Sequence, residues 1–190
     1  MVDSNSDLTL IELLKKKYNN QSKLIFLYDH QICSPNDVVI NPKKIGNGVY
    51  GEIYVAKCEG STEYKYIIKV QKENTINEAI TLEKLQKYNL TPKIYQVIKT
   101  ENDKLFIIMM DNMGTDVDTF LSETDDLIKL SNNLPKLIAE FNDIMERSFT
   151  IIKKFHSVGY THGDAHLGNF MVSDKINRIV KIIDFRILAE

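Results

Sequence analysis

The chain has 190 residues, 43% of them hydrophobic and 26% charged, and a formal net charge of −2 at pH 7. This composition is that of a folded globular protein, and the near-neutral charge gives no electrostatic support for binding DNA or RNA. No stretch approaches the about 20 apolar residues that span a bilayer, and residues 1–20 lack the apolar core of a secretory signal, so we expect no membrane insertion.

Apolar residues recur at helical spacing between positions 8 and 14, and Lys15–Lys17 follow them. Asp7 can cap the start of a helix, and lysines suit its C-terminal end. The pattern predicts a short amphipathic helix within an N-terminal extension over residues 1–39. We expect this helix to pack on the main body; the alternative is contact with a protein partner or a membrane surface.

Strand-like alternation of apolar and polar residues begins near residue 43, with a turn at Glu59–Thr62. A helical pattern follows, and then two more alternating stretches. The predicted order is strand, strand, helix, strand, strand, at residues 52–57, 64–70, 75–88, 94–99 and 105–110.

The pattern becomes helical after Gly114, and the longest helix is predicted at residues 134–155. Short strands are predicted at residues 170–172 and 179–183. A β-rich half followed by an α-rich half predicts a mixed α+β fold with two lobes. The expected lobes are residues 40–113, with an antiparallel sheet, and residues 114–190, a minimal and truncated helical lobe.

The two cysteines, Cys33 and Cys58, form no CxxC pair, and the histidines show no zinc-ligand spacing. Free cysteines usually pack as small hydrophobic residues. We therefore expect two separate thiols in a reducing, cytoplasmic environment.

Gly46-Asn47-Gly48-Val49-Tyr50-Gly51 has the form GxGxxG. In a dinucleotide-binding turn a helix would follow the glycines, whereas here a strand is predicted. A glycine-rich hairpin between two strands can instead approach a nucleoside triphosphate closely, because no Cβ intervenes. The alternative is a plain flexible hairpin.

Lys69 lies in the apolar strand Tyr66–Val70. An ammonium is costly to bury unless it is paired or binds an anion. Glu78, on the next predicted helix, is the preferred partner, and Glu83 on the same helix is the second candidate.

His162-Gly163-Asp164-Ala165-His166-Leu167-Gly168-Asn169 follows the long helix, and Asp184 ends a short apolar strand. In phosphoryl transfer one carboxylate orients the attacking hydroxyl, while an amide oxygen and a second carboxylate hold Mg²⁺ against the phosphates. The order of these residues predicts that chemistry, with Asp164 as the catalytic group and Asn169 and Asp184 as metal ligands.

Taken together, residues 43–186 resemble the eukaryotic-type protein kinase superfamily. Met110-Asp111-Asn112-Met113-Gly114 resembles the hinge of casein kinase I, the segment that binds adenine. The HGDxHxxN loop is similar to that of RIO and KEOPS-complex kinases and of aminoglycoside and choline phosphotransferases. The resemblance implies a bilobal kinase fold with Glu78 on helix C, and ATP and Mg²⁺ as cofactors. It further implies a catalytic role for Asp164 and Lys69 and nucleotide contacts from Gly46, Asn47, Gly48, Val49, Gly51, Ile53, Lys69, Glu78, Met110, Asp111, Met113 and His166.

Two positions depart from the family pattern. Gly163 stands where most protein kinases have arginine, and Arg186 replaces the glycine of the DFG motif. His166 is either a phosphate or substrate contact or a hydrogen-bonding residue that stabilises the loop. Because the arginine that Gly163 replaces commonly pairs with a phosphate on the activation loop, and the sequence ends at Glu190 without such a loop, control by activation-loop phosphorylation is not expected. No APE motif follows to provide a scaffold for peptide docking.

The residues support three functional hypotheses. The preferred one is a Mg²⁺-ATP-dependent serine/threonine kinase that acts on a protein of unknown identity. The second is a small-molecule phosphotransferase, suggested by the HGDxH string. The third is a catalytically weak pseudokinase that acts as a binding module.

Overall fold

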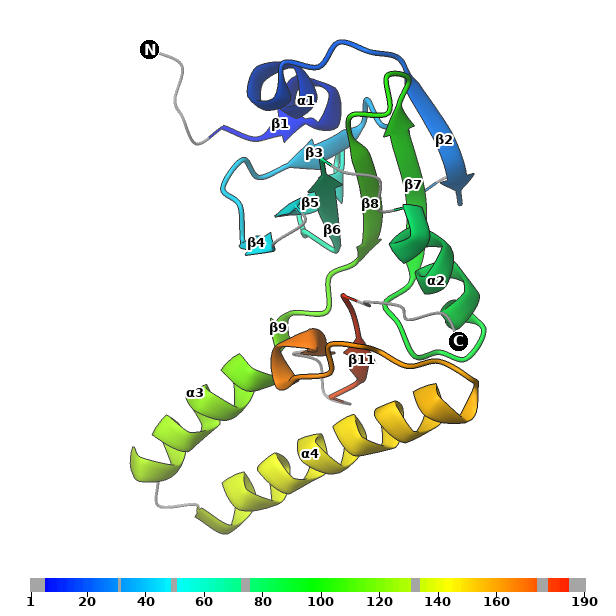
Figure 1. Cartoon of the computed structure of the whole chain (residues 1–190). Helices are drawn as coiled ribbons and strands as arrows, with labels where there is room; N and C mark the ends of the chain where they lie inside the picture. Colours follow the sequence, from blue (N-terminus) through cyan, green and yellow to red (C-terminus); the bar gives the residue numbers. More distant parts are fainter. Residues whose placement is uncertain are drawn as a thin grey trace. The chain divides into compact units, whose positions relative to one another are not determined.

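The computed structural model describes residues 6–30, 32–48, 51–72, 76–130, 134–173 and 178–184. The chain divides into two compact units, Met1–Ile80 with Lys93–Asn112 and Thr81–Pro92 with Met113–Glu190 (Figure 1). The mixed α+β composition expected from the sequence is confirmed. None of the helices in the described ranges combines the length and apolarity that crossing a bilayer requires.

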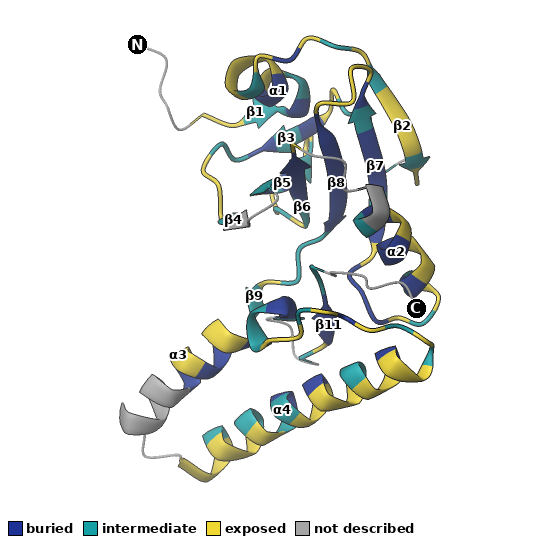
Figure 2. Ribbon diagram, viewed as in Figure 1, coloured by how far each residue is buried: buried dark blue, intermediate teal, exposed yellow. Residues whose placement is uncertain are grey.

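The first unit is built on an antiparallel sheet in which the described strands follow the order β1-β3-β5-β6-β8-β7-β2, and β4 pairs with β5. Its central strands are buried, whereas β2 lies at an edge and is largely exposed (Figure 2). The strands are β1 (Leu8–Thr9), β2 (Leu24–Asp29), β3 (Val38–Ile40), β4 (Gly46–Gly48), β5 (Gly51–Cys58), β6 (Tyr66–Gln71), β7 (Ile94–Thr100) and β8 (Phe106–Asp111).

The N-terminal helix is present as α1 (Leu10–Tyr18), but its predicted cap is wrong. The Thr9 hydroxyl accepts a hydrogen bond from the Glu12 amide, and the Glu12 carboxylate accepts one from the Thr9 amide, which forms a capping box. Asp7 instead accepts hydrogen bonds from the Tyr64 hydroxyl at 2.6 and 2.7 Å. Thr9 is the better cap because a glutamate follows it three residues later.

Helix α1 buries Leu10, Leu13 and Leu14 in one hydrophobic cluster with residues of the sheet. The sheet residues of this cluster include Tyr54, Ala56, Ile68, Val70, Ile107 and Met109. Of the two roles expected for this helix, packing on the main body is the one observed. Residues 1–39 also supply β1 and β2, which extend the sheet at opposite edges and which the sequence analysis did not predict.

Helix α2 (Ile76–Gln86) follows β6 and occupies the position predicted for a helix at residues 75–88. Ala79, Leu82 and Leu85 are buried, at the spacing that places apolar side chains on one helical face.

The second unit contains two long helices, α3 (Val117–Leu130) and α4 (Leu134–Ser157), the latter close to its predicted limits. The Asp116 carboxylate accepts hydrogen bonds from the amide and hydroxyl of Thr119 and so caps α3. The unit also has a small sheet in the order β11-β10-β9, formed by β9 (Thr115–Asp116), β10 (Phe170–Val172) and β11 (Val180–Ile182). The 3₁₀ helix η1 (Leu167–Asn169) directly precedes β10.

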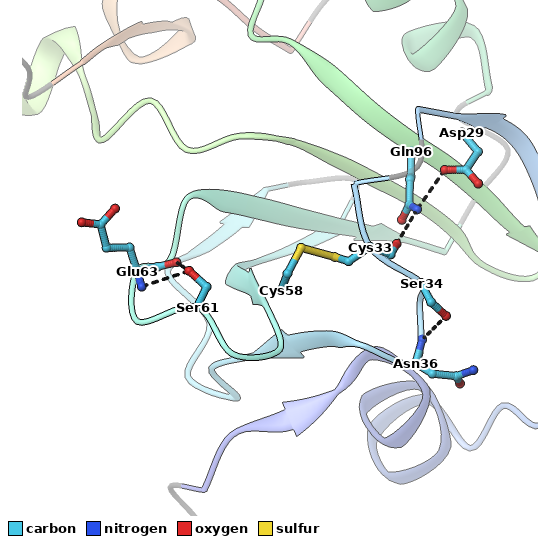
Figure 3. Close-up of a disulfide and its surroundings, with 8 residues drawn as sticks. All are labelled: Asp29, Cys33, Ser34, Asn36, Cys58, Ser61, Glu63 and Gln96. Carbon is cyan, nitrogen blue, oxygen red and sulfur yellow. Dashed lines mark hydrogen bonds between the residues drawn. A yellow bond between two sulfur atoms is a disulfide. The ribbon is translucent and has the colours of Figure 1, made fainter.

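The expectation of two separate thiols is wrong, because Cys33 and Cys58 form a disulfide (Figure 3). Their Cα atoms lie 6.0 Å apart, a normal separation for this bond. Strand β3 pairs with β5 so that Val38 lies opposite Cys58, and this pairing brings the preceding loop beside the end of β5. The argument from free thiols for a reducing cytoplasm therefore no longer holds.

Reduction of this disulfide is expected to lower the free energy of unfolding by about 3 kcal/mol. The bond closes a loop with a sequence separation of 25 residues, which restricts the unfolded chain. Urea unfolding with and without dithiothreitol measures the difference. The Cys33→Ser/Cys58→Ser variant is the control, and its free energy of unfolding should be the same with and without dithiothreitol. Equal stability of the wild type in both conditions would contradict the prediction.

Candidate active site

The glycine-rich segment forms the β4–β5 hairpin, with Gly46 opposite Ile53 and Gly48 opposite Gly51. A strand follows the glycines, as expected, where a dinucleotide-binding turn would have a helix. At Gly51 a Cβ would lie 2.4 Å from the Val70 carbonyl oxygen, so only glycine allows β5 to approach β6 this closely. Val49 lies outside the described residues, and only the backbone of Asn47 and Gly48 is described.

Replacing Gly51 by alanine is expected to lower the free energy of unfolding by about 1–3 kcal/mol, because the new methyl group overlaps a backbone oxygen that cannot move independently. Gly46→Ala is the matched control. Its Cβ would come no closer than 3.3 Å to the Ile53 side chain, so a smaller loss is expected. Urea denaturation compares them, and equal losses would count against a steric requirement at Gly51.

Lys69 lies on β6 opposite Ile53 on β5 and opposite Ile108 on β8. Its side chain is nearly inaccessible, with 4% of the residue surface exposed. The Nζ atom lies 2.7 Å from Oε1 of Glu78, so the expected ion pair is present. Glu83 is exposed, as its position on another face of α2 suggests. The paired carboxylate offsets the cost of burying the ammonium.

Gln71 also contacts Glu78 and was not predicted as part of this group. Its Nε2 atom donates a hydrogen bond to the second carboxylate oxygen at 2.6 Å. Lys69 and Gln71 are two positions apart on β6, so they project from the same face. This spacing was the feature of the sequence that could have indicated Gln71 as a second partner of Glu78. The two bonds fix the carboxylate of Glu78 and, through it, the ammonium of Lys69.

The predicted hinge begins at the end of β8. Met110 is buried, and the Asp111 carboxylate accepts a hydrogen bond from the Tyr95 hydroxyl at 2.8 Å. Burial, aided by this hydrogen bond, raises the pKa of Tyr95, so the phenol remains protonated at neutral pH. The Asp111 amide donates to the carbonyl of Lys93. Met113, the last predicted hinge residue, begins the second unit and is partly buried.

In the second unit, His162 joins the loop that contains Asp164 to the segment that contains Asp184. Its Nδ1 atom lies 3.3 Å from the amide nitrogen of Asp164, and its Nε2 atom lies 2.9 Å from the carbonyl oxygen of Ile183. A neutral imidazole with its proton on Nε2 satisfies both bonds. The sequence analysis did not assign this role, because the contact with Ile183 is made across 21 residues.

Burial lowers the pKa of His162 below its ordinary value of 6.5, although the bond to Ile183 and the charges of Asp164 and Asp184 oppose this. The unfolded chain therefore takes up a proton before the folded chain as the pH falls. The stabilisation by the neutral ring is fully present above pH 6.5 and is lost progressively below it, as the pH falls toward the folded-state pKa.

We expect the free energy of unfolding of the wild type to decrease between pH 7.5 and pH 5.5 more steeply than that of His162→Gln. The limit for one group is about 1.4 kcal/mol per pH unit. Urea titrations at several pH values measure this slope. His156→Asn, at an exposed position in the last turn of α4, is the control and should keep the wild-type slope. Equal slopes for the wild type and His162→Gln would contradict the assignment.

Asn169 is buried and fixed in orientation. Its side-chain Nδ2 donates a hydrogen bond to the main-chain carbonyl of Asp164 at 2.9 Å. The main-chain carbonyl of Asn169 accepts a hydrogen bond from the amide of Ile183 at 2.9 Å. The first bond identifies which end of the amide is the donor, so Oδ1 is the end that can serve a cation. The second brings the residue before Asp184 against Asn169.

Asp184 and Gly163 both have left-handed backbone conformations, with φ of 55° and 73° respectively. Such a conformation is strained for a residue with a side chain and recurs at functional sites. At Gly163 it explains why glycine replaces arginine in this loop. Phe185 and Arg186 lie outside the described residues.

His166 is exposed and precedes η1 without a side-chain hydrogen bond that caps it. Its ring lies beside Gly168, where a Cβ would come within 3.1 Å of two ring atoms. This exposure leaves a contact with a phosphate or substrate open to it.

The structure thus brings the predicted residues together in two groups. The first unit joins Lys69 to Glu78, beside Ile53 and the glycine hairpin. In the second, the Asn169 side chain binds the main chain of Asp164, and the main chain of Asn169 binds that of Ile183, next to Asp184. In the described part of the chain, no three His, Cys, Asp or Glu side chains form a metal-binding cluster. Asn169 and Asp184 supply the hard oxygen atoms that Mg²⁺ prefers.

A model of the family of protein tyrosine and serine/threonine kinases matches residues 39–190. The match includes every candidate residue from Gly46 to Asp184. A search of curated proteins gave no match. Because the family match covers most of the chain and includes both groups of residues described above, this chain belongs to the protein tyrosine and serine/threonine kinase family.

Proposed function

We propose that the chain transfers the γ-phosphoryl group of ATP to a serine or threonine hydroxyl of a protein, in the manner of a small atypical kinase. Family membership supports ATP-dependent phosphotransfer in general. The observation that carries the proposal is the buried ion pair of Lys69 and Glu78 next to the glycine hairpin. An ammonium held in an apolar strand by one carboxylate is suited to binding phosphate oxygens.

The proposed nucleotide contacts are those that the resemblance to kinases implies. The glycine hairpin binds the phosphates, Ile53 and Met110 contact the adenine ring, and the backbone of Asp111 and Met113 pairs with its edge. The remaining nucleotide contacts are Asn47, Val49 and His166.

The hydroxyl oxygen of the acceptor forms a bond to the γ-phosphorus, and the bond from that phosphorus to the bridging oxygen of ADP breaks. The carboxylate of Asp164 orients the hydroxyl and accepts its proton. Asn169 and Asp184 would hold Mg²⁺, which neutralises charge that develops on the phosphates when it is bound. Lys69 contributes a further positive charge to the same oxygens.

Purified protein, labelled ATP and Mg²⁺ test this proposal, with a set of protein acceptors analysed for phosphoserine, phosphothreonine and phosphotyrosine. Label on serine or threonine supports it, and label on tyrosine alone corrects the acceptor. Thermal melting with and without Mg²⁺-ATP reports binding separately, because a ligand of the native state raises Tm. Binding without any transfer would instead favour the pseudokinase hypothesis.

One observation favours a second candidate, a small-molecule phosphotransferase. Gly163 has φ of 73°, a conformation that disfavours the arginine found there in most protein kinases. The loop therefore follows the HGDxH form that also occurs in aminoglycoside and choline phosphotransferases. A coupled assay of ADP release with amino alcohols and aminoglycosides distinguishes the two. Turnover with these acceptors and none with proteins would replace the first proposal.

A further inference from the structure

A single carboxylate in the first unit, that of Glu52, contacts four other side chains. It accepts hydrogen bonds from the hydroxyls of Tyr18 and Tyr54, the latter at 2.8 Å. Lys17 and Lys44 form ion pairs with it at 3.2 and 3.5 Å. The two phenol oxygens also lie 3.2 Å apart. We call these five residues the Glu52 network.

The network connects α1 with the glycine hairpin. Lys17 and Tyr18 are the last two residues of α1, whereas Lys44 lies just before β4 and Glu52 follows Gly51 directly on β5. Helix α1 is itself held by its leucines in the core of the same unit. The end of a fixed helix is therefore tied to the strand that carries the last glycine of the hairpin.

The hydrogen bonds and ion pairs of the Glu52 network involve a charged group and are therefore strong. Hydrogen bonds to an ionised carboxylate are about twice as strong as those between neutral groups. The side chain of Glu52 is 20% exposed, so water screens the contacts only in part. Burial alone would raise the pKa of Glu52, but the bonds from Tyr18, Tyr54 and Lys17 lower it to about 2. The carboxylate of Glu52 is therefore charged throughout the neutral range.

The glycine hairpin needs such support. Glycine has the largest conformational freedom of any residue, so a glycine-rich segment loses much entropy when a ligand orders it. Fixing a binding segment before the ligand arrives reduces this cost and increases affinity. Of the two hairpin glycines whose surroundings are described, Gly46 and Gly51, Gly51 is the more closely packed.

We propose that Tyr18 is a positioning residue for nucleotide binding, which acts through Glu52 to hold the β4–β5 hairpin in its binding conformation. This inference rests on the proposed ATP-dependent function. In this proposal the N-terminal helix contributes to the affinity for nucleotide and has no part in the chemical step.

The matched variants are Tyr18→Phe and Tyr64→Phe. Both remove one phenol hydroxyl that binds a carboxylate and that ties the N-terminal extension to the sheet. The carboxylate that the Tyr64 hydroxyl binds is that of Asp7, whereas the Tyr18 hydroxyl binds Glu52. Tyr64 lies just before β6. We expect Tyr18→Phe to raise the KM for ATP about threefold to tenfold, in line with partial loss of one charge-assisted hydrogen bond. We expect kcat to change less than about twofold, and Tyr64→Phe to match the wild type in both.

Hydrogen exchange of the amides of β4 and β5, measured without nucleotide, is the second readout. Tyr18→Phe should increase exchange there, and Tyr64→Phe should not. Wild-type KM and exchange in Tyr18→Phe would overturn the inference. If Tyr18→Phe loses cooperative melting, Lys44→Met makes the same test from the hairpin side. A wild type that binds no nucleotide would contradict the proposed function, whereas the exchange comparison would still decide whether Tyr18 orders the hairpin.

Discussion

Replacing Asp164 by asparagine is expected to lower the rate of phosphoryl transfer by about 10²- to 10⁴-fold, the usual contribution of a positioned general base. The substitution keeps the size of the side chain and removes its ability to accept the hydroxyl proton. The hydrogen bonds from the Asp164 amide to His162 and from Asn169 to the Asp164 carbonyl use the main chain, so both can persist in the variant.

Transfer of labelled phosphate under saturating ATP measures this effect, and the rise in Tm on adding Mg²⁺-ATP shows whether binding is kept. Asp143→Asn is the matched control. Asp143 lies on α4, where it forms an ion pair with Arg147, and its replacement should leave transfer within about twofold of the wild type. A transfer rate in Asp164→Asn equal to that of Asp143→Asn would remove Asp164 from the catalytic role.

Replacing Lys69 by methionine is expected to have two effects. Transfer should decrease by about 10²- to 10³-fold, the loss typical of removing one group that stabilises charge in the transition state. The free energy of unfolding should also decrease, by about 3 kcal/mol, because Glu78 keeps a poorly accessible charge without its cation. Transfer assays and urea unfolding measure the two effects separately.

The double variant Lys69→Met/Glu78→Gln separates folding from function. It replaces the ion pair by two neutral side chains of similar size, so most of the lost stability should return. Transfer should remain low, because the ammonium that we propose binds phosphate is absent. If the double variant regains transfer together with stability, the role of Lys69 is structural only.

The pairing of Lys69 with Glu78 could be predicted because it follows from local chemistry. A lysine among Ile67, Ile68 and Val70 must have a counter-ion or an anionic ligand, and the next helix offers few carboxylates. The strands around it were also predictable, since alternation of polar and apolar residues depends only on the residues of each strand. The residues of the HGDxHxxN loop and Asp184 were identified in the same way, by type and order.

Other features depended on which strands pair and could not be predicted from local patterns. Cys33 and Cys58 looked like unrelated thiols until β3 was placed beside β5. Strand β2 gave no clear alternation, because residues 24–28 are all apolar. Its pairing with β7 also has a register shift between Phe26 and Tyr28. A pattern in the sequence reports on neighbours a few residues away, and these contacts join residues much farther apart.

The sequence by itself determined the family of this protein and the order of the side chains that we propose bind phosphate, orient a hydroxyl and hold Mg²⁺. The tertiary structure decided how these groups are held. Gln71 and Glu78 fix Lys69, His162 joins Asp164 to the segment of Asp184, and α1 meets the glycine hairpin at Glu52. The physical reason is that residue type sets what a group can do, whereas its orientation and burial come from partners that only the folded chain brings together.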